Sequence, residues 1–267
     1  MSWLGAPSTM GALDFISPNA YTAAGVVTKD PNLILDDLFA TLNNLDGGRG
    51  LEKIEEFQQE NNVDIRRDLA SSLGNEFLVA IDGPVLPSPS WKIVLEVSDP
   101  GRLQNALTLA FNELNRRAAI EQKPIWTVTS QNRGGSTFYK ATLEGFPTEI
   151  DYTFLGGYLV IAPNSALLLD SSRYWVTGSS LGRSAEFRQQ LPADGRTDFS
   201  GFVYHNIKSL TDAVAGGALT GVNIQFPTLI CLYGYPDRVV MSSKSVLGTD
   251  IMSAERLGVL TAGIGGR

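Results

Sequence analysis

The chain of 267 residues has few of the residue types that build recognisable reactive sites. It contains one cysteine, Cys231, and one histidine, His205. A lone cysteine excludes an intramolecular disulfide and a zinc site of clustered cysteines. With one histidine and no spaced Asp-x-Asp-x-Asp-Gly loop, we predict no metal site and no cofactor. Because Cys231 lies in an apolar run, we expect its thiol to be buried and unreactive.

Long apolar runs and dense positive charge are also missing. No stretch approaches about 18 consecutive apolar residues, so we predict no transmembrane segment in this chain. Residues 1–10 lack the basic and apolar regions of a signal peptide. The net charge of −7 argues against a nucleic-acid partner, because phosphate recognition needs clustered lysine and arginine. The arginine pairs at 66–67 and 116–117 are short, and we expect them to pair with neighbouring acids on helices.

The chain does contain a recurring strand that stops at Asp or Asn and passes into a helix. Asp caps the first helical amides, and Pro fits the first helical position. The two closest copies use Asp30-Pro31 and Asp99-Pro100, and the two looser copies use Asn164 and Asn206. The four units cover residues 21–42, 91–119, 158–175 and 199–215. These units indicate an internally repeated α+β protein.

Glycine pairs in the second half indicate hairpins. Gly134-Gly135 and Gly156-Gly157 separate short strand patterns between residues 125 and 162, and glycine tolerates the positive φ of tight turns. A further pair of strands is predicted at 228–233 and 238–242. We therefore predict an α+β fold with a largely antiparallel sheet and helices on one face. It is a single domain of residues 1–267, or two related halves at about 1–120 and 121–267.

A proline-rich segment follows a strand predicted at 77–81, which in turn follows a helix predicted at 65–73. Residues 82–91 hold three prolines and end on a tryptophan, so the segment should be stiff and partly polyproline-like. A rigid loop with an aromatic anchor loses little entropy on binding. We predict a binding site for a protein partner at Pro84, Pro87, Pro89 and Trp91. The alternative is a connector that packs on its own sheet.

The most specific candidate for a catalytic motif lies around Ser180, where the sequence matches the Gly-x-Ser-x-Gly pattern of a nucleophile elbow. Asp198 and His205 follow in the order expected of an α/β-hydrolase. The elbow, however, needs a strand before the serine and a helix directly after it, whereas a helical pattern precedes Ser180. His205 shares a strand face with Val203, which favours a hydrogen-bonded structural histidine.

Two other patterns have structural explanations. Gly47-Gly48-Arg49-Gly50 follows a helix and lacks the Gly-Lys-Ser/Thr ending of a P-loop, so we interpret it as a linker. The adjacent acids Asp36-Asp37 and Glu55-Glu56 diverge on a helix and do not form a catalytic pair. We therefore predict no catalytic residues.

Several short segments together resemble a known family. They are Ser2-Trp3-Leu4, Met10 to Phe15, Lys29-Asp30-Pro31, Leu73 to Phe77, Asp82-Gly83-Pro84 with Pro87, Pro89 to Lys92, Gly157 to Val160, Phe187-Arg188 with Leu191-Pro192, and Phe199-Ser200. The set is similar to the bacterial domain-of-unknown-function family 3352. The similarity covers this chain and matches the C-terminal half of that family's longer, typically exported members. It implies an extracytoplasmic or periplasmic setting and supplies no catalytic residues.

The sequence thus predicts a non-catalytic binding or structural module of the bacterial cell envelope. Two alternatives stay open: a serine-type hydrolase that uses Ser180, and a subunit of a larger assembly.

Overall fold

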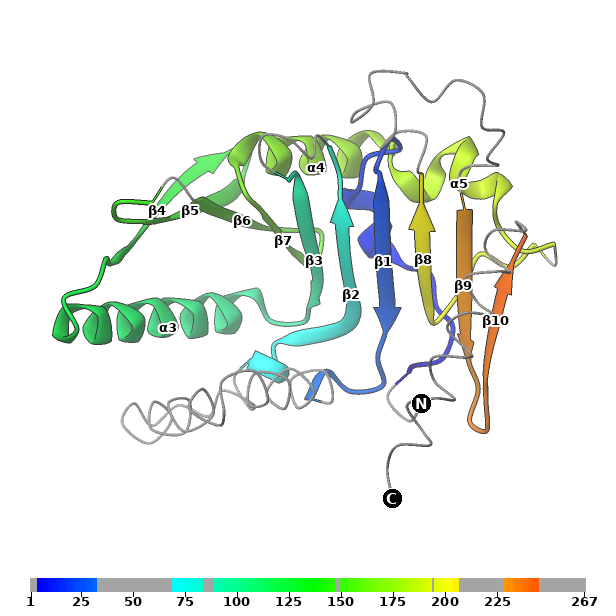
Figure 1. The fold of residues 1–267 in the computed structure, drawn as a ribbon, viewed down its shortest axis with the longest axis horizontal. Helices are drawn as coiled ribbons and strands as arrows, with labels where there is room; N and C mark the ends of the chain where they lie inside the picture. Colours follow the sequence, from blue (N-terminus) through cyan, green and yellow to red (C-terminus); the bar gives the residue numbers. More distant parts are fainter. Residues whose placement is uncertain are drawn as a thin grey trace. The chain divides into compact units, whose positions relative to one another are not determined.

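The computed structural model describes residues 4–32, 69–83, 89–146, 149–193, 195–206 and 228–244. Within these ranges the fold combines helices with a sheet, as an α+β protein does (Figure 1). The helical elements are η1 (Gly11–Phe15), α3 (Pro100–Ile120), α4 (Ser165–Thr177), η3 (Leu181–Arg183) and α5 (Ala185–Gln189). The strands are β1 (Thr22–Val27), β2 (Leu73–Ile81), β3 (Trp91–Val97), β4 (Trp126–Arg133), β5 (Ser136–Leu143), β6 (Glu149–Leu155), β7 (Tyr158–Ala162), β8 (Gly201–His205), β9 (Thr228–Gly234) and β10 (Val239–Ser243).

The described strands form one large antiparallel sheet. Their order is β10-β9-β8-β1-β2-β3-β7-β6-β5-β4. The predicted α+β class and antiparallel sheet are therefore confirmed. Two finer predictions are not tested. They are that the helices lie on one face of the sheet and that the strand-helix units are copies of one repeated module.

The chain divides into two compact units whose segments alternate along the sequence. Unit 1 comprises Met1–Val27, Leu78–Lys92 and Asp170–Arg267, and unit 2 comprises Thr28–Phe77 and Ile93–Leu169. The predicted single domain or pair of sequence halves stays a prediction.

Unit 2 contains the predicted meander β4-β5-β6-β7. Neighbouring strands pair in antiparallel register, with Tyr139 opposite Tyr152 and Phe154 opposite Leu159. The β4-β5 and β6-β7 turns use the predicted glycine pairs, and all four glycines have positive φ between 55° and 85°. An L side chain rarely adopts this conformation, so the glycines fix where each hairpin turns.

Helix α3 packs on this unit's sheet through a small apolar core. Leu103 of α3 lies in a buried cluster with Val97, Tyr152 and Leu159. The helix begins where the sequence predicted, because the Asp99 side chain accepts a hydrogen bond from the Arg102 N–H at 2.9 Å and Pro100 follows the cap.

The other predicted strand-to-helix junctions are described only in part. Asn164 Oδ1 accepts from the Leu167 N–H at 3.1 Å at the start of α4. Asp30 Oδ1 accepts from the Asn32 N–H at 2.9 Å. The helices predicted after Asn32 and after Asn206 lie outside the described residues.

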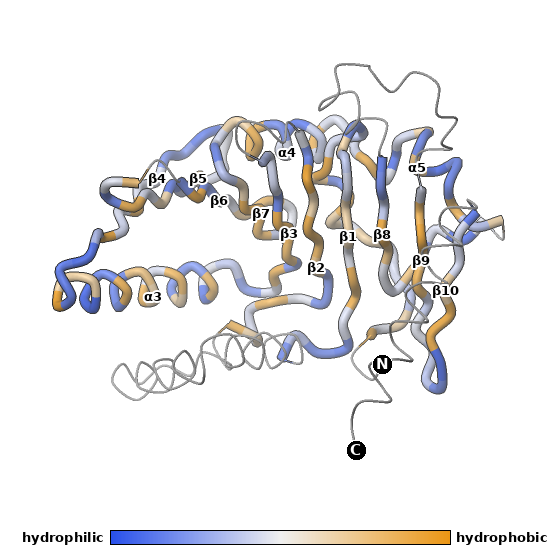
Figure 2. Tube along the Cα trace, viewed as in Figure 1, coloured by the Kyte–Doolittle hydropathy of each residue, from blue (hydrophilic) through white to orange (hydrophobic). Residues whose placement is uncertain are grey.

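Unit 1 has an aromatic core. Phe187 of α5 contacts the rings of Phe199, Phe202 and Tyr204, with centroids 5.5–6.5 Å apart. Cys231 of β9 is fully buried, which confirms its predicted burial. Orange apolar segments mark β9 in Figure 2, as expected for a strand whose residues are mostly buried. Among the described helices, none combines the length and the apolar character needed to cross a bilayer.

Candidate functional site

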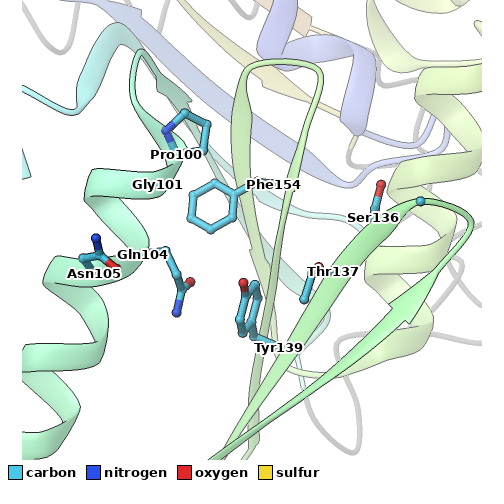
Figure 3. Close-up of a pocket in the computed structure, with 9 residues that line it drawn as sticks. Pro100, Gly101, Gln104, Asn105, Ser136, Thr137, Tyr139 and Phe154 are labelled. Atoms are coloured by element: carbon cyan, nitrogen blue, oxygen red, sulfur yellow. The ribbon is translucent and has the colours of Figure 1, made fainter.

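Unit 2 holds a pocket of about 410 Å³ beside the first turns of α3. Figure 3 shows side chains from α3 and from strands β5 and β6 facing this space. Its volume lies within the range of small-molecule sites, roughly 300–1,000 Å³. The lining consists of Pro100, Gly101, Gln104, Asn105, Gly135, Ser136, Thr137, Tyr139 and Phe154.

Gln104 lines the pocket with a side-chain amide whose N–H groups are hydrogen-bonded and whose oxygen is not. Its Nε2 donates to Thr108 Oγ1 at 3.2 Å and to Tyr152 Oη at 3.3 Å. Its Oε1 is buried and has no hydrogen-bond partner among the described residues. An unpaired buried acceptor costs about 1–3 kcal/mol. Because Oε1 is closed to solvent, a ligand O–H or N–H that removes this cost reaches it only when the Gln104 side chain shifts.

Aromatic rings form the wall opposite Gln104. Tyr139 stacks on Tyr152 with centroids 4.8 Å apart and planes 7° apart, and it meets Phe154 edge-on at 6.4 Å. Because each ring is held by another, the exposed part of the wall is fixed before a ligand arrives. Burial raises the pKa of the Tyr152 hydroxyl, while the hydrogen bond from Gln104 opposes this shift. Tyr152 therefore stays neutral at physiological pH.

The pocket presents amides, hydroxyls and aromatic faces, and none of its nine lining residues carries a charge. Among the described residues it therefore offers no direct counter-ion to a phosphate or a carboxylate. Its polar groups favour a ligand that brings its own neutral donors and acceptors. Sequence reasoning missed this site, because Gln104 and Tyr139 lie 35 positions apart and belong to no motif. One weak indication of the site was present in the sequence, which is that Gln104 places an amide on the sheet-facing side of a predicted helix.

Unit 1 contains a fully buried ion pair. Lys92 Nζ lies 2.5 Å from Asp82 Oδ2, and both side chains have 0% exposure. The Ser17 N–H donates to both Asp82 oxygens, at 3.0 and 3.2 Å, and Lys92 also donates to the Phe15 carbonyl at 3.4 Å. The Tyr174 ring lies 5.2 Å from the ammonium. Burial lowers the pKa of Lys92, and the Asp82 charge opposes that shift.

This ion pair lies at the base of the predicted binding loop. The Asp82 N–H donates to the Ser90 carbonyl at 2.7 Å, which joins the two ends of the loop. Pro89 is exposed, and Trp91 is half-buried as the first residue of β3. Pro84 and Pro87 lie outside the described residues. Binding by these four residues stays a prediction.

The structure does not arrange Ser180, Asp198 and His205 as the hydrolase alternative requires. Helix α4 precedes Ser180 and a 3₁₀ helix follows it, so the strand that an elbow needs is not in front of the serine. Ser180 Oγ donates to Asp14 Oδ1 at 3.0 Å and is buried. His205 Nδ1 lies 2.9 Å from Thr22 Oγ1, which agrees with a hydrogen-bonded structural histidine. Asp198 is exposed.

The remaining sequence patterns give no further site. Arg116 and Arg117 pair with Glu113, as predicted. Over the described ranges, no group of three or more His, Cys, Asp or Glu could hold a metal ion. The arginines at 66–67, the glycine-rich residues 47–50 and the acid pairs at 36–37 and 55–56 lie outside those ranges.

Comparison with known proteins finds little likeness. No family model matches the chain, and no curated protein matches it. Two crystal structures of TP0453 are distantly similar. Crystal form III shares 11% identity at a TM-score of 0.37 and covers 91% of this chain and 85% of that one. Crystal form I shares 10% identity at a TM-score of 0.35, with coverages of 93% and 86%. Likeness at this level assigns this chain neither a family nor a function.

Proposed function

We propose that this protein is a non-catalytic binding module of the bacterial cell envelope, and that its ligand is a small, uncharged, polar molecule held in the pocket of unit 2. The proposal rests on the buried Oε1 of Gln104, which has no partner among the described residues and belongs to a pocket whose described lining carries no charged side chain. The envelope setting rests on the resemblance to domain-of-unknown-function family 3352.

The chemistry of the lining supports a ligand with an apolar face and neutral hydrogen-bond donors. Such a face packs on the rings of Tyr139 and Phe154, and an O–H or N–H reaches Gln104 Oε1. Asn105, Ser136 and Thr137 add donors and acceptors around the rim. Neutral sugars and neutral amides have these properties, whereas phosphorylated or zwitterionic molecules would lose hydration without gaining a counter-ion.

The experiment is a calorimetric titration with neutral monosaccharides, N-acetyl amino-acid amides and the phosphorylated or ionised counterpart of each. We expect neutral probes to bind and their charged counterparts not to bind. Gln104→Leu removes the free acceptor at nearly constant volume and should weaken binding roughly tenfold, the equivalent of one good hydrogen bond. Asn112→Leu makes a comparable change at an exposed α3 position outside the pocket and should leave affinity unchanged. Preferential binding of the charged probes, or equal effects of the two variants, would refute the proposal.

A protein partner at Pro84, Pro87, Pro89 and Trp91 is a separate part of the binding proposal. It is supported by the closed base of the loop, where the Asp82–Ser90 hydrogen bond and the Lys92–Asp82 ion pair hold the two ends together. A fixed base lowers the entropy lost when a loop binds.

A further inference from the structure

Strand β4 is the last strand of the described sheet, and within the described residues no strand covers one of its edges. Among the described strands its neighbour is β5, which pairs with it along its whole length from Trp126↔Leu143 to Arg133↔Ser136. All its residues after Trp126 are exposed. An edge of this kind presents unpaired N–H and C=O groups to any strand that approaches.

One residue of this edge is already bonded in the way a neighbouring strand would bond it. The Asn115 side chain of α3 donates from Nδ2 to the Trp126 carbonyl at 2.6 Å, and its Oδ1 accepts from the Trp126 N–H at 2.6 Å. The backbone groups of Trp126 therefore point away from β5. Because backbone direction alternates along a strand, those of Val128, Ser130 and Asn132 point the same way.

The backbone groups of these three residues face the open edge. In the described part of the chain, no hydrogen bond joins their backbone groups to anything beyond β4. Natural proteins blunt exposed edges with lysine, proline or a bulge. Residues 127–133 contain no lysine and no proline, and they pair with β5 without a bulge.

We propose that the open edge of β4 binds the β4 strand of a second copy of this chain, antiparallel and centred on Ser130. In this register Ser130 faces Ser130, and Val128 faces Asn132. Each facing pair exchanges two N–H···O bonds, so the free groups of all three residues are satisfied. Such a contact is isologous, as in most homodimers.

The side chains are compatible with this self-pairing. Thr129 faces Gln131, and Thr127 faces Arg133, so the only charged side chain of the strand meets a neutral one. Like charges placed directly opposite each other would be destabilising, and this register places none there. The Asn115 contact ends the pairing before Trp126, whose counterpart would fall in the β4-β5 turn. The free part of the edge, residues 127–133, therefore has the same length as the strand that a second copy presents.

The first test measures the mass of the purified protein by sedimentation equilibrium over a range of concentrations. We expect a reversible monomer–dimer equilibrium. Ser130→Pro removes an outward-facing N–H that β5 does not use, so unit 2 should stay folded while dimerisation weakens roughly tenfold or more. Ser130→Ala keeps the backbone donor and should dimerise like the wild type. Far-UV circular dichroism checks that each variant is folded.

The second test uses charge at the two-fold axis. Ser130→Lys places two like charges opposite each other and should abolish the homodimer, as should Ser130→Glu. A mixture of these two variants should dimerise again, because opposite charges then face each other. A wild-type protein that is monomeric at every concentration, or a Ser130→Lys variant that dimerises normally, would overturn the proposal. So would a mixture that fails to associate while the wild type dimerises.

Discussion

At the residue scale, Glu113 of α3 forms ion pairs with two arginines of the same helix. Arg116 Nε donates to Oε2 at 2.7 Å, and Arg117 Nε donates to Oε1 at 2.6 Å. These hydrogen bonds, that from Arg116 first, hold the pKa of Glu113 at about 2, below its ordinary value of 4.5. A carboxyl whose pKa is lowered by folding stabilises the folded state above its unfolded pKa and loses this contribution as the pH falls.

We predict that Glu113→Gln lowers the free energy of unfolding at neutral pH by about 1 kcal/mol, a modest value because Arg116 is half exposed. The difference from the wild type should shrink as the pH falls below 4.5 and should be lost below about pH 2. Urea unfolding followed at several pH values measures it. Glu121→Gln, which changes an exposed pair with Lys123, serves as the control and should have almost no effect. A difference for Glu113→Gln that is independent of pH would contradict the assignment.

The Lys92–Asp82 pair gives a stronger prediction, because both side chains are fully buried. Removal of one partner from a buried pair leaves an uncompensated charge and costs about 3–5 kcal/mol. Lys92→Met and Asp82→Asn should each destabilise the protein by this amount in urea unfolding. The double variant should lose much less than the sum of the two. Strict additivity would show that the two groups do not act as a pair.

At the element scale, α3 depends on its first turn. We predict that Asp99→Ala lowers the free energy of unfolding by about 1 kcal/mol, because the Arg102 N–H loses its acceptor. Asp99→Asn keeps a capping oxygen and should retain most of the stability. Thermal unfolding of the three proteins gives the comparison. Equal losses in both variants would mean that the charge of Asp99, rather than its cap, holds the helix start.

The elements that were predictable are those with local signals. The glycine pairs fixed the hairpin turns, and Asp99-Pro100 fixed the start of α3. Strand β2 was predicted too short, because Leu73 was assigned to the end of a helix and Gly74-Asn75-Glu76 has little strand propensity. In the structure, Glu96 Oε2 of β3 accepts from the N–H groups of both Asn75 and Glu76, at 2.7 and 3.1 Å. A Cβ on Gly74 would lie 2.4 Å from Glu96 Cγ, so this approach needs glycine. The start of β2 is therefore stabilised by its neighbour β3, although its own residues have little strand propensity.

At the scale of the whole molecule, the sequence led to the α+β class and to the antiparallel sheet. It did not lead to the pocket or to the buried ion pair. Gln104 meets Tyr152 only after a helix has packed on a meander, and Asp82 meets Ser17 across 65 positions. Contacts of this kind follow from the order of strands in the sheet, which hydrophobic periodicity alone does not specify.

The proposed function requires that unit 2 carries a pocket for a small neutral polar ligand. The most direct test is the change in backbone amide chemical shifts on titration of the isotope-labelled protein with the tightest-binding neutral probe. We predict saturable shifts centred on Gln104, Asn105, Thr137 and Tyr139, and we expect the Gln104→Leu variant to need roughly tenfold more ligand for the same shifts. No saturable shift at these residues, or shifts centred on residues 89–92 instead, would contradict it.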